Sequence, residues 1–172
     1  MPVLPPDTER LHFTWWRESD LGEARALWGD PRVTALIDKR ERLPDAEIAQ
    51  RLRTEIDNAA QHGVQYWRLE RRDTGSFVGC AGLRPYPPVP DAAWELGFHL
   101  VHAAWGQGFA SDAGRAVRDF AFEHTDAQEL FAGHHPENHA SRATLGKLGF
   151  VKIDEWVYPP TGLVHPWYQL PR

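Results

Sequence analysis

The chain has 172 residues, of which 42% are hydrophobic and 25% charged, with a formal net charge of −5 at pH 7. This is the composition of an ordinary soluble globular protein, and the length fits one domain with a well-formed core. The charge argues against a nucleic-acid phosphate track, which needs clustered Lys and Arg, and no apolar run approaches the roughly eighteen residues of a membrane span.

Compartment and redox chemistry are indicated by the first residues and by cysteine usage. Residues 1–7 lack the basic start and apolar core of a signal peptide. Cys80 is the only cysteine, which excludes an internal disulfide framework and a cysteine-rich zinc site. We therefore expect a cytoplasmic protein with neither a nucleic acid nor a membrane as partner.

The pattern along the chain predicts seven strands and four helices in the order β-α-α-β-β-β-α-β-α-β-β. The strands are expected at 8–17, 64–71, 76–83, 93–101, 128–134, 150–157 and 164–170. The helices are expected between 19 and 29, between 44 and 63, from 109 to 120 and from 136 to 148. A hairpin turn is expected at 72–75, and four prolines predict a loop over 84–91. This order favours a single α/β domain with a mixed sheet.

The fourth predicted strand alternates regularly along its length. One face would carry Trp94, Leu96, Phe98 and Leu100, and the other Ala93, Glu95, Gly97 and His99. If the strand stays regular, Glu95 and His99 share a face, and Gly97 leaves room for a substrate between them. A bulge would turn His99 away and leave Glu95 unaffected.

A glycine pair stands where this strand leads into the next helix, in Trp105-Gly106-Gln107-Gly108-Phe109-Ala110. Glycines let the backbone approach an anion closely, and the first helical turn adds free N–H donors. No Gly-Lys-Ser/Thr follows, and the third glycine of a dinucleotide fingerprint is missing. The segment therefore indicates either a pyrophosphate site of another kind or simply a tight turn.

Several motifs in order give the chain a resemblance to a known family, the GNAT-type N-acetyltransferases. It is most similar to their RimJ/RimL-type branch, which acetylates protein N-terminal amines. The segments that carry the resemblance are Thr8-Glu9-Arg10-Leu11, Asp30-Pro31-Arg32-Val33, Trp94-Glu95-Leu96-Gly97-Phe98-His99-Leu100, Trp105 to Ala110, His135-Pro136-Glu137-Asn138-His139-Ala140-Ser141 and Lys147-Leu148-Gly149-Phe150. The resemblance implies a GNAT fold over residues 1–172, with a twisted sheet splayed between its fourth and fifth strands.

The same resemblance implies acetyl-CoA as cosubstrate and assigns residues to it. Backbone amides of Gly106, Gln107, Gly108, Phe109 and Ala110 would hold the pyrophosphate, and the pantetheine arm would pair with Phe98, His99, Leu100 and Val101. Asn138 would contact the pantetheine, and Ser141 would face the thiol. Two departures from the family are Trp105, where Gln or Arg is frequent in the superfamily, and 102–104, where a Pro-Glu pair is usual. Neither removes the backbone donors.

Acetyl transfer to an amine needs a proton acceptor, an oxyanion donor and a leaving thiolate. Glu95 is the first candidate base, directly or through water, and a solvated or salt-bridged strand residue is the alternative interpretation. His134 is a second candidate. The oxyanion donor would be a backbone N–H near His99 or Leu100. Ser141 would assist the thiolate, with helix capping as its alternative role.

The acceptor is expected to be a primary amine, either a protein N-terminal α-amine or a small molecule. An α-amine with a pKa near 8 needs less help to deprotonate than lysine near 10.4. No metal is expected, because the nine histidines include no His-Glu-x-x-His pattern. The competing function is a non-catalytic acyl-CoA-binding regulatory domain. A homodimer formed through the final strands is a further possibility.

Overall fold

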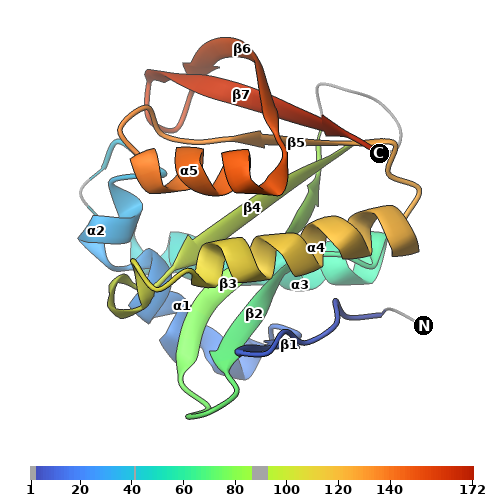
Figure 1. The fold of residues 1–172 in the computed structure, drawn as a ribbon. Coiled ribbons are helices and arrows are strands. Elements are labelled where there is room, and N and C mark those ends of the chain that lie inside the picture. The colour runs from blue at the N-terminus through green and yellow to red at the C-terminus, as the bar shows by residue number, and fades with distance from the viewer. Residues whose placement is uncertain (1–2, 41, 87–92) are drawn as a thin grey trace.

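The computed structural model describes residues 3–40, 42–86 and 93–172, whose strands form one sheet with the order β1-β2-β3-β4-β5-β7-β6 (Figure 1). The strands are β1 (Leu11–Thr14), β2 (Tyr66–Arg71), β3 (Phe77–Pro85), β4 (Ala93–Leu100), β5 (Glu129–Gly133), β6 (Val151–Tyr158) and β7 (Leu163–Pro171). The α-helices are α1 (Leu21–Trp28), α2 (Pro31–Thr34), α3 (Asp45–His62), α4 (Phe109–His124) and α5 (His139–Leu148). Two short 3-10 helices are η1 (Glu18–Asp20) and η2 (His102–Ala104).

The predicted mixed sheet of seven strands is confirmed, whereas the described residues contain five α-helices and not four. The additional helix, α2, follows Gly29, where the sequence suggested only the end of the first helix. The Asp30 carboxylate caps α2 by accepting a hydrogen bond from Arg32 N at 2.9 Å, and Pro31 takes the first helical position. Residues that end one helix thus also begin the next.

The two connections that flank β3 have different outcomes. The hairpin turn predicted at 72–75 is confirmed, since Gly75 has a φ of +70° and its N–H donates to Arg71 O at 2.8 Å. The loop predicted over 84–91 is wrong at its start, because β3 continues through Pro85. Proline is tolerated there because a strand end needs no further N–H donor. The rest of that loop, at 87–92, lies outside the described residues.

Strands β4 and β5 are parallel neighbours only where they begin. Their register runs from Ala93 opposite Glu129 to Glu95 opposite Phe131, which is three pairs. On its other side β4 stays paired with β3, without a register shift, from Trp94 onward. The predicted splay between the fourth and fifth strands is therefore confirmed, and we call the place where they diverge the fork.

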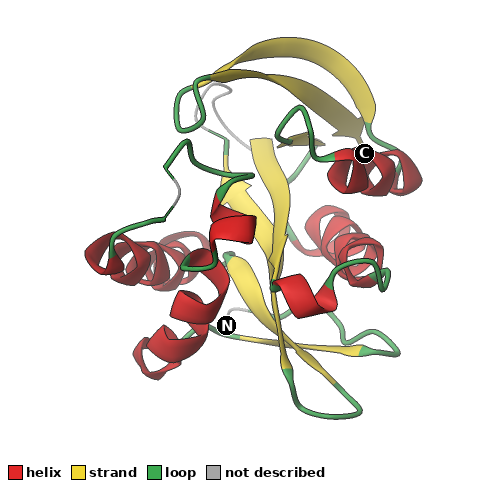
Figure 2. Ribbon diagram, turned by 90° about the vertical axis from the view of Figure 1, so that its left-hand side faces the viewer, coloured by secondary structure: helices red, strands yellow, loops and turns green. Residues whose placement is uncertain are grey.

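Helices cover both faces of the sheet (Figures 1 and 2). Helices α1, α2 and α3 pack on one face around Tyr66 and Cys80, and α4 and α5 pack on the other around Trp67. The alternation predicted for β4 is confirmed, because the α4 core is built or contacted by Trp94, Leu96, Phe98 and Leu100. His99 lies on the opposite face, against Tyr66.

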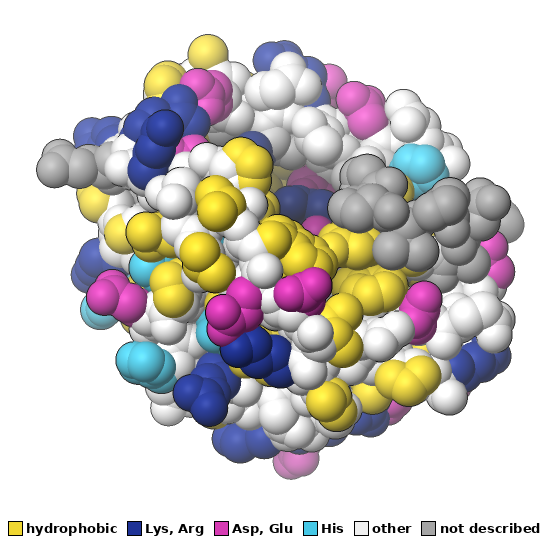
Figure 3. Space-filling model, turned by 90° about the horizontal axis from the view of Figure 1, so that it is seen from above, with side chains coloured by type: hydrophobic (Ala, Val, Ile, Leu, Met, Phe, Trp, Pro, Cys, Tyr) yellow, Lys and Arg dark blue, Asp and Glu magenta, His cyan; other side chains and the backbone are white. Residues whose placement is uncertain are grey.

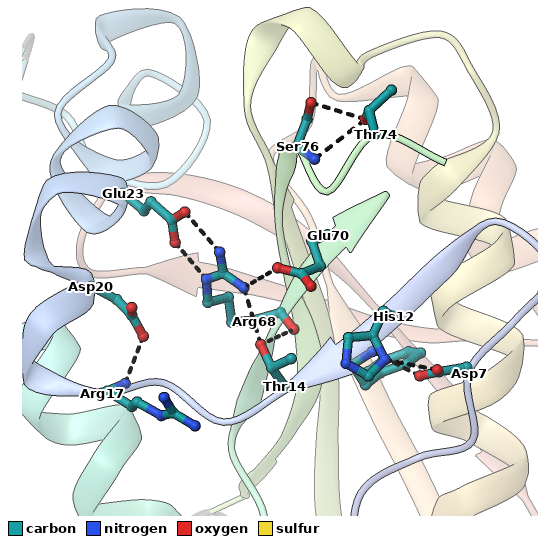
Figure 4. A network of polar contacts seen from close by, with 11 residues as sticks. Asp7, His12, Thr14, Arg17, Asp20, Glu23, Arg68, Glu70, Thr74 and Ser76 are labelled. Carbon is teal, nitrogen blue, oxygen red and sulfur yellow. Dashed lines mark hydrogen bonds and ion pairs between the residues drawn. The ribbon is translucent and has the colours of Figure 1, made fainter. Parts of the chain in front are cut away.

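At the edge of the sheet formed by β1 and β2, the Arg68 side chain of β2 connects β1 to α1 (Figure 4). Its guanidinium pairs with Glu23 of α1 and, at 2.7 Å, with Glu70 of its own strand. It also donates to Thr14 Oγ1 of β1 at 3.2 Å. Only 13% of the Arg68 side chain is exposed, so these bonds are shielded from water and fix α1 against the sheet.

A buried carboxylate connects α3 to the sheet. Glu55 is 1% exposed, and its Oε2 accepts from Tyr66 N at 2.8 Å while Oε1 accepts from Arg84 Nη2 at 2.6 Å. Gln65 donates to Glu55 O at 2.9 Å and accepts from Trp16 N at the same distance. One side chain thereby holds α3, the start of β2 and the end of β3 together.

Replacing this carboxylate should destabilise the protein strongly. We expect Glu55→Ala to lower the free energy of unfolding by about 3–5 kcal/mol, because it leaves the Arg84 charge without its buried partner. Urea unfolding followed by circular dichroism measures the change. Asp57→Ala, exposed on the same helix, is the control and should change stability by less than about 0.5 kcal/mol. A loss below about 1 kcal/mol for Glu55→Ala would contradict the role given to this ion pair.

Candidate functional site

A cavity of about 780 Å³ lies at the fork, between β4, the start of α4, the start of α5, and helices α2 and α3. Ten of the twelve residues assigned to the site from the sequence line it: Glu95, Phe98, His99, Leu100, Gly106, Gly108, Phe109, Ala110, Asn138 and Ser141. The other two, Val101 and Gln107, do not line it. Residues from three separate segments are thus brought to one cavity.

The cradle, residues 105–110, ends in the first turn of α4. Gly106 and Gly108 have φ values of +72° and +79°, a left-handed backbone that other residues adopt only at a cost. In the described part of the chain, the N–H groups of residues 106–110 donate no hydrogen bond to protein. Free amides at a helix N-terminus, with its partial positive charge, form an anion site.

Three side chains hold the loop from outside. Trp105 Nε1 donates to Leu100 O at 2.9 Å, and Gln107 Nε2 donates to Ala103 O at 2.8 Å. Arg10, which precedes β1, donates from Nη1 to Gln107 O at 2.7 Å. These bonds use carbonyl groups of the loop and of the residues before it, and they leave the amides of the loop available to a ligand.

The edge of β4 that faces β5 has no strand partner beyond Glu95. Phe98 and Leu100 line the large cavity along this edge, and a second cavity of about 70 Å³ lies between Gly97 and Gly133 at the fork. An unpaired strand edge presents a row of backbone donors and acceptors. An extended ligand with amide groups can therefore pair with β4 as an added strand would.

Glu95 lies on the same face of β4 as His99 and reaches the cavity. The Tyr66 hydroxyl donates to its Oε1 at 3.4 Å. Arg84 stands directly opposite it in the β3–β4 register but pairs with Glu55. Of the two forms of the alternative interpretation of Glu95, solvated or salt-bridged, the salt bridge is not formed among the described residues. Burial raises the pKa of Glu95 above its ordinary value, which suits a proton acceptor near neutral pH.

Gly97 has a different use from the one expected. A Cβ atom at this position would lie 2.0 Å from the Tyr66 hydroxyl oxygen. The prediction that Gly97 leaves room for a substrate between Glu95 and His99 is therefore wrong, because Tyr66 fills that space. Tyr66 is only 2% exposed, and its placement against Gly97 brings its hydroxyl to Glu95.

The two histidines of the site are held neutral. His99 Nδ1 accepts from Trp28 Nε1 at 3.1 Å, and burial keeps the pKa of His99 well below its ordinary value. His134 Nδ1 donates to His135 O at 2.7 Å, so its Nε2 accepts from the Tyr168 hydroxyl at 3.2 Å. Burial also lowers the pKa of His134. His134 lines the cavity, but both of its nitrogens are engaged.

Helix α5 begins at His139, three residues later than predicted, because Asn138 is its N-cap. The Asn138 Oδ1 accepts the N–H of Ser141 at 3.0 Å, which leaves the Asn138 amide group for a ligand. The alternative role for Ser141 is helix capping. In the structure its main-chain N–H is the group that the Asn138 cap binds. Among the described residues its hydroxyl makes no hydrogen bond, so it is available to a group in the cavity.

The lining also includes side chains outside the sequence motifs, among them Arg51, Tyr66, Arg84 and Tyr158. The Arg84 guanidinium lies over the Tyr66 ring, 3.8 Å from its centroid. The signal that identifies Arg84 is the strand register, which places it opposite Glu95. That register is not readable from the sequence, because no local pattern specifies which residues of two strands stand opposite each other.

Other chemistries find little support in the described ranges. They contain no group of three or more His, Cys, Asp or Glu residues placed to hold a metal ion. None of the helices within them combines the length and apolar character that crossing a membrane requires. Cys80 is fully buried, and burial raises the pKa of its thiol, so it is a core residue.

Comparison with known proteins gives consistent results. The family model described as acetyltransferase (GNAT) domain matches residues 10–151. The uncharacterised protein YkkB of Bacillus subtilis is 31% identical over 147 residues, which are 83% of this chain and 82% of YkkB. The uncharacterised N-acetyltransferase YoaA of the same organism is 31% identical over 156 residues, 88% of this chain and 84% of YoaA. The solved structure of Mycobacterium smegmatis RimJ in complex with CoA-disulfide has the same fold, with a TM-score of 0.81 and 17% identity. The match covers 99% of this chain and 88% of the RimJ chain.

The environment of Glu95 predicts a measurable dependence of stability on pH. The folded pKa lies above the unfolded value near 4.5, so the contribution of Glu95 is full below that value and is lost as pH rises through the folded pKa. We expect Glu95→Gln to become progressively more stable than the natural protein as the pH rises from about 4.5 through the folded pKa of Glu95. Urea unfolding across this range measures the difference. Glu9→Gln, at an exposed position, is the control for the loss of one carboxylate. A pH-independent difference for Glu95→Gln would contradict the raised pKa.

Proposed function

Because the chain belongs to the GNAT acetyltransferase family, we propose that it transfers the acetyl group of acetyl-CoA to a primary amine by direct attack of the amine nitrogen. The acceptor is a protein N-terminal α-amine or a small-molecule amine. One observation carries this proposal: a single cavity joins a cradle of free backbone amides to a half-buried carboxylate that has no ion pair among the described residues.

The cradle and the open edge of β4 form the donor half of the site. The amides of residues 106–110 would hold the pyrophosphate, whose negative charge the N-terminus of α4 stabilises. The pantetheine arm would pair with Phe98 to Val101 along the free edge, and the Asn138 amide would contact it. When bound, acetyl-CoA supplies the activated thioester carbon that the amine attacks.

Glu95 would accept the proton of the acceptor amine, directly or through one water molecule. Its raised pKa and its freedom from Arg84 leave its oxygens available for this. The Tyr66 hydroxyl, at 3.4 Å, keeps the carboxylate oriented from the side of α3. His134 is less suited, because its unprotonated nitrogen already accepts from Tyr168.

The remaining requirements concern the thioester oxygen and the leaving sulfur. A backbone N–H near His99 or Leu100 would stabilise the oxyanion, a contribution of about 3–4 kcal/mol for a well-placed donor. The Ser141 hydroxyl would donate to the departing thiolate, since its main-chain N–H and not its hydroxyl serves the helix cap. A thiol of ordinary acidity needs only modest help to leave.

The competing proposal is a non-catalytic acyl-CoA-binding domain. Such a protein would need the cradle but no carboxylate with a raised pKa beside it. A CoA-thiol release assay with α-amine peptides, lysine peptides and small amines separates the two. If acetyl-CoA raises the melting temperature and no acceptor gives turnover, the enzymatic proposal is wrong.

Removing the proposed base should slow the chemical step. For Glu95→Gln we expect kcat to fall about 10²- to 10⁴-fold, while the affinity for acetyl-CoA changes less than about threefold. Steady-state kinetics and calorimetry measure the two quantities. His134→Gln tests the second candidate, and a larger loss of kcat in that variant than in Glu95→Gln would reverse the assignment.

The cradle can be tested through its second glycine. Gly108→Val places a β-branched residue at a φ of +79°, which costs about 1–2 kcal/mol locally and displaces the amides. We expect acetyl-CoA affinity to fall at least about tenfold, measured by calorimetry. Gly63→Val is the matched control, because Gly63 has a φ of +71° at the end of α3, away from the cavity. Unchanged affinity in Gly108→Val, or an equal loss in Gly63→Val, would show that the cradle does not bind the pyrophosphate.

A further inference from the structure

Two arginines line the cavity from the side of α3 and β3. Arg84 stands opposite Glu95 in the β3–β4 register, and Arg51 lies one turn before Glu55 on α3. Both are far along the sequence from the cradle and from α5, so they are not part of the proposed donor half. Seen from above, the molecule is hollowed, and basic and acidic side chains lie in this hollow next to hydrophobic ones (Figure 3).

Arg84 already has a partner. Its Nη2 donates to Glu55 Oε1 at 2.6 Å, and its guanidinium stacks on Tyr66. The carboxylate of Glu55 is completed by the Tyr66 N–H at 2.8 Å. Arg84 is therefore a structural cation that also shapes the wall of the cavity.

Arg51 differs, because the acidic residues around it are paired elsewhere. Both Asp38 and Glu47 bind Arg40, with N–O distances of 2.8 Å. Glu55 binds Arg84. Among residues 3–40, 42–86 and 93–172, Arg51 makes no hydrogen bond and no ion pair. Burial lowers the pKa of Arg51, and the nearby Arg84 charge acts in the same direction, against the charges of Glu55 and Asp38.

A partly buried guanidinium without a counter-ion is unfavourable, and a ligand that supplies the counter-ion removes this cost. The cavity reached by Arg51 is the one reached by Glu95. A substrate amine bound there can contact the Glu95 carboxylate, which accepts a proton, and the Arg51 guanidinium, a planar cation with several N–H donors. Such a pair of groups is complementary to a molecule that carries both an amine and an anionic group.

We propose that the acceptor of this site is a primary amine that also carries a carboxylate, with the amine at Glu95 and the carboxylate bound by Arg51. The inference depends on the proposed acetyltransferase function and narrows its acceptor. A free amino acid and a peptide with an acidic first residue both present this chemistry. An amine without a carboxylate supplies no counter-ion to the Arg51 guanidinium and binds more weakly.

The test uses the full-length protein with acetyl-CoA and matched acceptors. The common L-amino acids, their carboxamides, and peptides beginning with Asp, Asn, Glu or Gln are compared by CoA-thiol release. For at least one carboxylate and amide pair we expect kcat/KM to be about 10- to 100-fold higher for the carboxylate. Turnover of the free amino acids identifies an amino acid as the acceptor, and turnover of the peptides that begin with Asp or Glu identifies an acidic peptide.

The variant Arg51→Gln should reduce this preference to less than about threefold, mainly through a higher KM for the carboxylate, with little change for the amide. It should also be at least as stable as the natural protein, because the lost charge had no partner among the described residues. A residue with a purely structural role would instead lower stability and leave the preference intact. Arg53→Gln, an exposed arginine on the same helix, is the matched control and should leave the preference unchanged.

Two results would overturn the proposal. One is equal turnover of carboxylates and amides by the natural protein, and the other is a preference that persists in Arg51→Gln. If no amine is acetylated, the proposed function fails, and calorimetry of the same compounds with the CoA-loaded protein then decides the inference. Tighter binding of carboxylates that is lost in Arg51→Gln would support it, and equal binding of acids and amides would overturn it.

Discussion

Strands β4 and β5 are paired over only three residues, and the site depends on their divergence beyond that point. The two strands begin as parallel neighbours and then diverge, while β5 stays paired with β7 along its whole length. The sheet therefore has a wedge-shaped gap whose wall includes the open edge of β4. Backbone groups along such an edge need partners, and a ligand with amide groups can supply them. The N-termini of α4 and α5, with the cradle and Asn138, both reach this gap.

The charges on the α3 side are organised around Glu55, and this arrangement determines the state of Glu95. Because Glu55 takes the Arg84 guanidinium and the Tyr66 N–H, Arg84 is held away from the carboxylate that lies directly opposite it. Glu95 therefore forms no ion pair among the described residues, and burial raises its pKa more than the Arg84 charge lowers it. A buried ion pair is a weak source of stability in itself. Its effect here is to stack Arg84 on the Tyr66 ring, whose hydroxyl reaches Glu95.

Local signals predicted much of this molecule correctly. The seven strands, the alternation of β4 and the turn at 72–75 are fixed by neighbours in the chain, so their residues carry a readable pattern. The errors arose where one residue has two uses. Asp30 and Pro31 resemble the end of α1 and in fact begin α2. Gly97 resembles an open place in a site, and a side chain two strands away occupies it.

By itself the sequence determined the donor half of the proposed site, because the cradle consists of consecutive backbone groups whose geometry glycines and a helix start encode locally. It also determined that Glu95 and His99 share a face, since side chains alternate along a regular strand. Only the tertiary structure decided the acceptor half. The register of β3 against β4 and the packing of α3 place Arg84, Tyr66 and Arg51 around Glu95. These contacts join residues about ten to forty-five positions apart, and no local pattern specifies such pairs.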